Sequence, residues 1–209
     1  MKNIGHRTSA VPTPPGPARA HGRGQAAVYE MQPATGADRR AVSDLIRDRI
    51  LQLGEGARAG IEAPGATVVD LLGQTEAGRP IVWLLREDSQ LLGCIALLGS
   101  TPGQGWSAQQ LAEPALSVIA LFTDPRCRGQ GLSRFMVWWA LDYAARLGGV
   151  DWLRGVSRSD RLMRYVRDDM HCSGVETVLR GGRHVHLLQH CPRREPSLAA
   201  LIAETTPTA

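Results

Sequence analysis

Apolar residues recur at three- and four-residue steps over residues 132–147, and this spacing predicts the longest helix of the chain. Gly148-Gly149 follows the last apolar position and is a typical helix stop. Weaker helical spacing predicts three further helices. The first follows Thr35, which could act as an N-cap with Asp38 three residues on. The apolar positions of these three helices are Val42, Leu45, Ile46, Ile50 and Leu53; Val68, Val69, Leu71 and Leu72; and Leu162, Met163 and Val166.

Continuous apolar runs bounded by polar or turn-forming residues predict strands between these helices. The clearest run ends at Asp124-Pro125, because proline cannot donate a hydrogen bond to a sheet ladder. Residues Gly54–Gly65 are predicted to form a loop. The predicted strands are Ala27–Met31, Ile81–Leu85, Leu91–Leu98, Ala115–Thr123, Asp151–Val156, Cys172–Leu179 and His184–His190, with Gly181-Gly182 as a hairpin turn before the last.

The resulting order is β-α-α-β-β-β-α-β-α-β-β, in which strands first alternate with helices and later run consecutively. This order predicts an α+β fold, with a mixed sheet and helices packed on it. Residues 1–26 are rich in proline, glycine and arginine and are expected to be a disordered tail. We therefore expect one domain over residues 27–190 and a partly disordered extension over 191–209.

Composition narrows the class of protein. Of the 209 residues, 43% are hydrophobic and 21% are charged, which suits a globular domain with a core. The net charge of +4 is mostly arginine spread along the chain, so no nucleic-acid-binding arm is expected. No apolar stretch approaches about 20 residues, so no membrane span is expected. Four cysteines without a C-x-x-C pair, and no signal peptide, favour reduced thiols in a cytoplasmic protein.

The segment Thr123–Leu132 carries the most informative chemistry. A strand ends, a turn with two arginines and two glycines follows, and the long helix begins. The N-terminus of a helix exposes backbone N–H groups, and glycines let that backbone approach a bulky anion, so a phosphate or pyrophosphate is the natural ligand. An ordinary strand–turn–helix junction with surface arginines is the alternative at this point. A P-loop is excluded, because no Gly-Lys-Ser/Thr follows.

Arg126-x-x-Gly129-x-Gly131, placed after strand-Asp-Pro and opening a helix, is similar to the acyl-CoA signature of the GNAT superfamily of N-acetyltransferases. The resemblance covers roughly residues 27–190. It implies a mixed, mostly antiparallel sheet that is splayed at the cofactor site. It also implies acetyl-CoA as co-substrate, no metal, and direct attack by an amine in a ternary complex. The acceptor it suggests is a small-molecule amine, and the resemblance leaves a homodimer open.

The same resemblance assigns the cofactor contacts residue by residue. It gives the pantetheine arm to the backbone at the strand end and the pyrophosphate to the turn, mostly through main-chain N–H groups. The family's later Asn position is occupied by Arg158, with Ser159 beside it, and its Gly-Phe position reads Asp169-Met170. The expected contacts are Leu121, Phe122, Thr123, Arg126, Cys127, Arg128, Gly129, Gln130, Gly131, Leu132 and Ser159.

Tyr165 occupies the family's tyrosine position and is the expected general acid for the leaving thiolate; a core tyrosine with its hydroxyl at the surface is the alternative. The general base is open, because strand 116–123 has no carboxylate and Glu113 and Asp124 only flank it. A water-mediated base, or an amine that is already neutral, would serve instead. Cys127 is disfavoured as a nucleophile, because direct transfer needs none.

His184, His186 and His190 share one face of a predicted strand, but zinc is disfavoured because no fourth ligand has suitable spacing. Trp138-Trp139 is interpreted as core packing. Two other functions remain open. One is N-acetylation of proteins or peptides, and the other is a non-catalytic module that binds acyl-CoA. The absence of a carboxylate on the strand favours the module slightly, and Tyr165 disfavours it.

Overall fold

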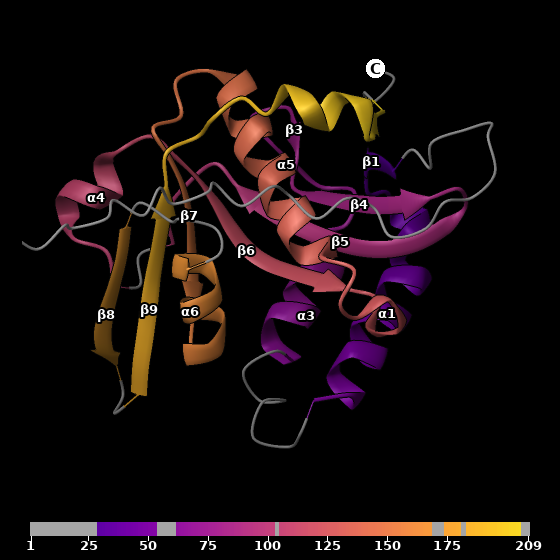
Figure 1. Cartoon of the computed structure of the whole chain (residues 1–209), viewed down its shortest axis with the longest axis horizontal. Coiled ribbons are helices and arrows are strands. Elements are labelled where there is room, and N and C mark those ends of the chain that lie inside the picture. The colour runs from indigo at the N-terminus through magenta and orange to yellow at the C-terminus, as the bar shows by residue number, and fades with distance from the viewer. Residues whose placement is uncertain (1–28, 54–61, 103–104, 169–173, 181–182, 206–209) are drawn as a thin grey trace, which may run out of the picture.

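The computed structural model describes residues 29–53, 62–102, 105–168, 174–180 and 183–205 (Figure 1). The predictions for the tail, for 54–61, for Cys172, for the Gly181-Gly182 turn and for Asp169-Met170 lie outside these residues. The helices are α1 (Arg39–Leu51), α3 (Glu62–Asp70), α4 (Ala108–Ala112), α5 (Leu132–Leu147) and α6 (Asp160–Asp168), and the 3-10 helices are η1 (Gly36–Asp38), η2 (Pro125–Cys127) and η3 (Pro196–Ala200).

Eight strands form the main sheet in the order β10-β1-β4-β5-β6-β7-β9-β8. Two pairs, β1 with β10 and β6 with β7, are parallel, and the other five are antiparallel. This confirms the mostly antiparallel mixed sheet expected from the resemblance. The strands are β1 (Tyr29–Pro33), β4 (Val82–Glu87), β5 (Gln90–Leu98), β6 (Ala115–Thr123), β7 (Trp152–Ser157), β8 (Gly174–Arg180), β9 (Arg183–His190) and β10 (Ile202–Glu204), and a small hairpin joins β2 (Thr75–Glu76) to β3 (Arg79–Pro80).

Side chains that alternate along the central strands separate two cores, one on each face of the sheet. Leu85 and Ile95 pack with α5 and with the C-terminal segment on one face. Their neighbours Leu84 and Cys94 pack with α1 and α3 on the other face. The sheet therefore lies between α5 and the α1/α3 pair. The turn before α5 directly follows β6, which is a central strand of this sheet.

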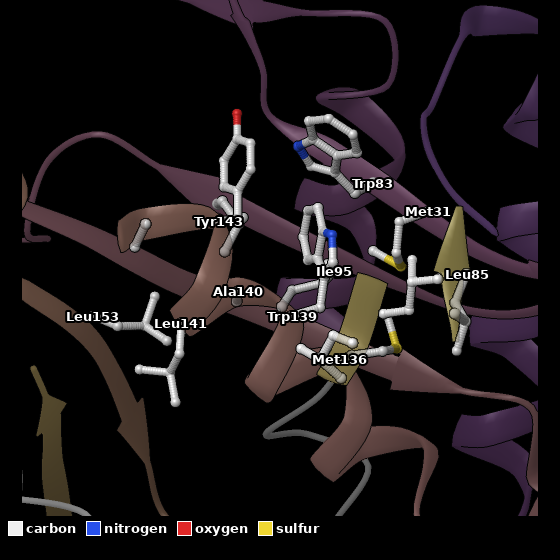
Figure 2. Packing of buried hydrophobic residues seen from close by; sticks show 14 of the residues in the cluster. Met31, Trp83, Leu85, Ile95, Met136, Trp139, Ala140, Leu141, Tyr143 and Leu153 are labelled. Atoms are coloured by element: carbon white, nitrogen blue, oxygen red, sulfur yellow. The ribbon is translucent and has the colours of Figure 1, made fainter. Parts of the chain in front are cut away.

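Helix α5 is anchored by a cluster of aromatic side chains (Figure 2). The ring of Trp139 stacks on Tyr143 at 5.1 Å between centroids, and Trp83 lies 5.0 Å from Trp139. Trp139 is only 2% exposed, which confirms its interpretation as core. Trp138 is partly buried, and the guanidinium of Arg134 lies 5.1 Å from the centre of its ring. The packing fixes α5, and with it the direction of its N-terminus.

The C-terminal segment contributes η3 and β10, neither of which was predicted. Leu198 and Ile202 enter the same core as α5. Asp142 of α5 accepts hydrogen bonds from the Glu195 amide at 2.8 Å and from Arg194 at 3.0 Å. This segment therefore ties α5 to the β1 edge of the sheet.

Other short elements also differ from prediction, among them the β2–β3 hairpin and two helices. Helix α3 begins at Glu62, so residues 62–65 are helical and not part of a loop. Helix α4 was not predicted, and Ser107 caps it by accepting a hydrogen bond from the Gln110 amide. None of the helices that the structure describes combines the length and the apolar character that crossing a membrane requires.

Candidate functional site

The central strands β6 and β7 separate partway along their length. Their parallel pairing runs from Ala115 opposite Trp152 to Val118 opposite Gly155. The next residue, Ile119, lies in a register shift against β5, which pairs with Val118 and then with Ala120. A bulge of this kind bends a strand and increases its local twist. The second half of β6 therefore diverges from β7 at the Ile119 bulge.

The register also shows which backbone groups of β6 face this divergence. The Asp124 amide donates to the Leu92 carbonyl of β5 at 2.7 Å. Because the groups of successive residues alternate in direction, the backbone groups of Phe122 also face β5, whereas those of Leu121 and Thr123 point to the opposite side. The Phe122 side chain is a 5% exposed member of the α1/α3 core. Among the three strand residues expected to hold the pantetheine arm, Leu121 and Thr123 therefore present main-chain groups to the divergence.

The turn after β6 is stabilised by Asp124. Its carboxylate, 3% exposed, accepts from the Arg126 amide at 2.8 Å and from the Arg126 guanidinium at 2.6 Å. These hydrogen bonds from Arg126 hold the pKa of Asp124 below its ordinary value. Asp124 thus shapes the turn, as its position before Pro125 predicted. Arg126 is engaged by Asp124, whereas Arg128 is exposed, with no ion pair recorded among the described residues.

Two glycines of the turn adopt backbone conformations that other residues rarely take. Gly129 has φ +87° and Gly131 has φ +74°, and Gly131 is the N-cap of α5. A Cβ added to Gly129 would meet nothing within 4 Å, so this side of the turn is open. The first intrahelical bond runs from the Phe135 amide to the Gly131 carbonyl. By helix geometry, the amides of residues 132–134 have no acceptor within α5 and are available to an anion.

Cys127 lies in the same turn but does not have the properties of a nucleophile. Its side chain is half-buried and packs against the α5 core. Burial raises the pKa of the Cys127 thiol, and nearby Asp124 raises it further. The thiolate is therefore disfavoured, in agreement with the sequence interpretation.

Ser159 and Tyr165 belong to the segment that follows β7. The Ser159 hydroxyl accepts from the Leu162 amide at 3.2 Å, and its carbonyl accepts from the Met163 amide at 2.9 Å. Ser159 therefore caps α6. Tyr165 is a half-buried residue of α6, which packs against β7 and β9.

The two carboxylates that flank β6 are both bound to arginines. Glu113 is paired with Arg154 of β7, which is 1% exposed. Arg154 also donates to Thr101 at 3.0 Å, and its guanidinium lies 4.7 Å from the centre of the Trp106 ring. Asp124 is bound to Arg126 as described above. Each of the two carboxylates thus has an arginine partner in the structure.

The three histidines of β9 differ in burial despite sharing a face. His186 is 3% exposed, whereas His184 is exposed. His186 contacts Asp160, the first residue of α6, a partner 26 residues away that no sequence spacing could indicate. Within the described ranges, no three His, Cys, Asp or Glu side chains are grouped so that they could hold a metal ion.

Several solved structures with a similar fold are described as acetyltransferases. A GNAT-family acetyltransferase from Listeria monocytogenes aligns with a TM-score of 0.55 at 14% identity, over 78% of this chain and 94% of that one. A protein from Bordetella pertussis assigned provisionally as a GNAT-family acetyltransferase gives 0.53 at 15% identity, over 77% and 94%. A protein assigned provisionally as a phosphinothricin N-acetyltransferase gives 0.52 at 16% identity, over 79% and 99%. At such identities these similarities establish the fold class, that of GNAT-type acetyltransferases.

The family follows from the sequence itself. The family model described as acetyltransferase (GNAT) matches residues 57–170, which include the divergent strands, the glycine turn, α5 and α6. The chain belongs to the acetyltransferase (GNAT) family. No curated protein matches the chain.

Proposed function

We propose that the chain transfers an acetyl group from acetyl-CoA to a primary amine of a small molecule, by direct attack within a ternary complex. The observation that carries the proposal is the divergence of β6 from β7 directly before a positive-φ glycine turn and the N-terminus of α5. It offers outward-facing backbone groups at Leu121 and Thr123 for the amides of an extended pantetheine arm. It also offers helix N–H groups and Arg128 for a diphosphate.

The residues present fit that ligand. A Cβ at Gly129 would stand in open space, on the side where a phosphate must approach the backbone. We assign the diphosphate contacts to the turn from Cys127 to Leu132, mainly through N–H groups. Arg126 supports the turn through Asp124, and Arg128 supplies the exposed charge. When bound, acetyl-CoA supplies the activated acyl group.

The chemistry then requires a neutral amine, an attack on the thioester carbonyl carbon, and loss of the C–S bond electrons to the thiolate. Tyr165 of α6 is our candidate to protonate that sulfur, while water takes the proton that the amine loses. The start of α6 is attached to the divergent end of β7, because the Ser157 hydroxyl accepts a hydrogen bond from the Ser159 amide at 3.0 Å. Most of the rate would come from holding the two reactants together.

The proposal is tested by calorimetry with CoA, followed by thiol release from acetyl-CoA with a panel of small amines and peptides. Saturable CoA binding and turnover with a small amine are expected. Activity on peptides alone would move the acceptor class to peptides. CoA binding without any thiol release would point to a non-catalytic module, which the arginine-bound state of Glu113 and Asp124 favours.

Replacing Tyr165 by Phe tests the acid. We expect kcat to fall at least about 100-fold while the Kd for CoA stays nearly constant, because only the proton donor is removed. Tyr143→Phe is the matched control. It also removes one tyrosine hydroxyl, but the Tyr143 ring packs in the core against Trp83 and Trp139. An unchanged kcat in Tyr165→Phe would exclude Tyr165 as the acid.

A further inference from the structure

A histidine that the proposed chemistry does not use joins the start of α6 to the sheet. His186 Nε2 lies 2.7 Å from Asp160 Oδ1, and His186 Nδ1 lies 2.9 Å from Thr177 Oγ1. His186 is 3% exposed, whereas Asp160 is 75% exposed. One interior imidazole therefore links β9, β8 and the first residue of α6.

The chemistry of the three groups fixes the direction of these hydrogen bonds. A carboxylate only accepts, so Nε2 carries a proton and donates to Asp160. In the neutral ring Nδ1 then accepts, and the Thr177 hydroxyl donates to it. Both ring nitrogens are thus occupied by protein groups, and a role in holding position fits this geometry better than a role in proton transfer.

The link sits where β7 has already separated from β6. His186 of β9 is paired with Ser157 of β7. Ser157 lies two residues after Gly155, which is the last β7 residue that pairs with β6. Ser157 also accepts from the Ser159 amide, and Ser159 caps the helix. The N-terminal end of α6 is therefore attached to β7 through Ser157 and to β9 through His186.

Tyr165 lies five residues after Asp160, about 7.5 Å further along the helix axis at the rise of an α-helix. A displacement at the start of α6 would be carried to Tyr165, because a helix this short moves as a unit. Misplacement of a reacting group by about 1 Å can cost about 100-fold in rate. The position of the tyrosine thus depends on the bond that holds Asp160.

We propose that His186 is a positioning residue, which through Asp160 holds α6 and its Tyr165 against the diverging end of β7. The inference rests on the proposed transferase function. It assigns a role to His186, the most buried of the three histidines on one face of β9. The role requires a hydrogen bond between Asp160 and His186, but it does not require the negative charge of Asp160.

The test uses variants at the exposed partner, where folding is least at risk. Asp160→Ala removes the acceptor, whereas Asp160→Asn keeps an acceptor oxygen and removes the charge. Asp168→Ala is the matched control, because Asp168 is an exposed aspartate of the same helix whose recorded partner is the adjacent Arg167. A fourth variant, His186→Gln, retains a donor for Asp160 and an acceptor for Thr177.

In Asp160→Ala we expect kcat to fall about tenfold or more, with the Kd for CoA and the KM for acetyl-CoA within about twofold of wild type. Asp160→Asn and His186→Gln should recover most of kcat. Amide hydrogen exchange at residues 162–164 should be faster in Asp160→Ala than in Asp168→Ala, a readout that needs no catalysis.

Two results would overturn the positioning role while leaving the transferase function intact: a kcat in Asp160→Ala equal to that of Asp168→Ala, or an Asp160→Asn variant as slow as Asp160→Ala. The second would mean that the charge of Asp160 matters rather than its hydrogen bond. A wild-type protein that binds no CoA and turns over no amine would overturn both proposals, and is recognised before any variant is made.

Discussion

The anion site at the start of α5 can be tested by giving Gly131 a side chain. Gly131 is the N-cap of α5, with φ +74° and ψ 14°. In Gly131→Ala the new methyl group would have the Arg134 Nη2 atom, at 3.8 Å, as its nearest neighbour. The substitution therefore introduces no clash in the free protein, and its direct cost is the left-handed backbone conformation, about 1–2 kcal/mol.

The expected effect on binding is larger than this strain explains. In the proposed site, a Cβ at Gly131 would stand beside the backbone N–H groups that the diphosphate must approach. A hydrogen bond to a charged group contributes about 1.5–3 kcal/mol, and each 1.4 kcal/mol corresponds to tenfold in Kd. Loss of one such bond should therefore weaken CoA binding by about 10- to 100-fold. The melting temperature should fall by about 2–4 °C for each kcal/mol of strain.

Gly148→Ala is the matched control, at the opposite end of the same helix. Gly148 has φ +67° and ψ 156°, a region that is essentially restricted to glycine, and an added Cβ meets nothing within 4 Å. We expect Gly148→Ala to lower the melting temperature at least as much as Gly131→Ala, with no change in the Kd for CoA by calorimetry. Equal losses of affinity in the two variants would refute the reasoning, because strain alone would then account for both.

Two further predictions concern stability. Burial alone would raise the pKa of Asp142, but hydrogen bonds from the Glu195 amide and from Arg194 and Arg146 outweigh it and lower this pKa. Ionised Asp142 therefore stabilises the folded protein above about pH 4, the ordinary aspartate range. This stabilisation is lost as the pH falls through the lowered pKa of Asp142. Asp142→Asn should cost about 1–3 kcal/mol in urea unfolding at pH 7, and the difference from wild type should shrink below pH 4; a constant difference would contradict the assignment. Gly93→Ala should destabilise by at least about 1–3 kcal/mol, because its Cβ would lie 2.8 Å from the Phe122 carbonyl oxygen, a backbone atom that cannot rotate away. An unchanged urea midpoint in Gly93→Ala would show that β5 and β6 can separate at little cost.

The elements nearest the site could be predicted from sequence because strong local signals bound them. The helix 132–147 and the strand 115–123 were predicted with their observed ends. An apolar periodicity closed by two glycines defines the helix, and Asp124-Pro125 ends the strand. The turn between them carries its own chemical signature, so the proposal of an anion site there rests on local residues.

The rest depends on contacts between distant residues, which local patterns do not encode. β10 has only three residues, and its place beside β1 depends on the pairing of Tyr29 with Ile202. The divergence of β6 from β7 depends on a bulge at Ile119, where no glycine or proline marks the irregularity. Parity placed three histidines on one face, but it could not indicate that His186 is buried and contacts Asp160 of α6.

The arrangement of charges around β6 bears on how the proposed transfer would be catalysed. Glu113 forms an ion pair with Arg154, and Asp124 forms one with Arg126 in the turn, so each flanking carboxylate is paired with an arginine. Protonating either carboxylate would break an ion pair that the structure contains. Proton removal by water is consistent with this, and it leaves the alignment of amine, thioester and Tyr165 as the main source of rate. The inference about His186 follows the same logic, because a site that depends on alignment is sensitive to the bond that fixes the helix carrying Tyr165.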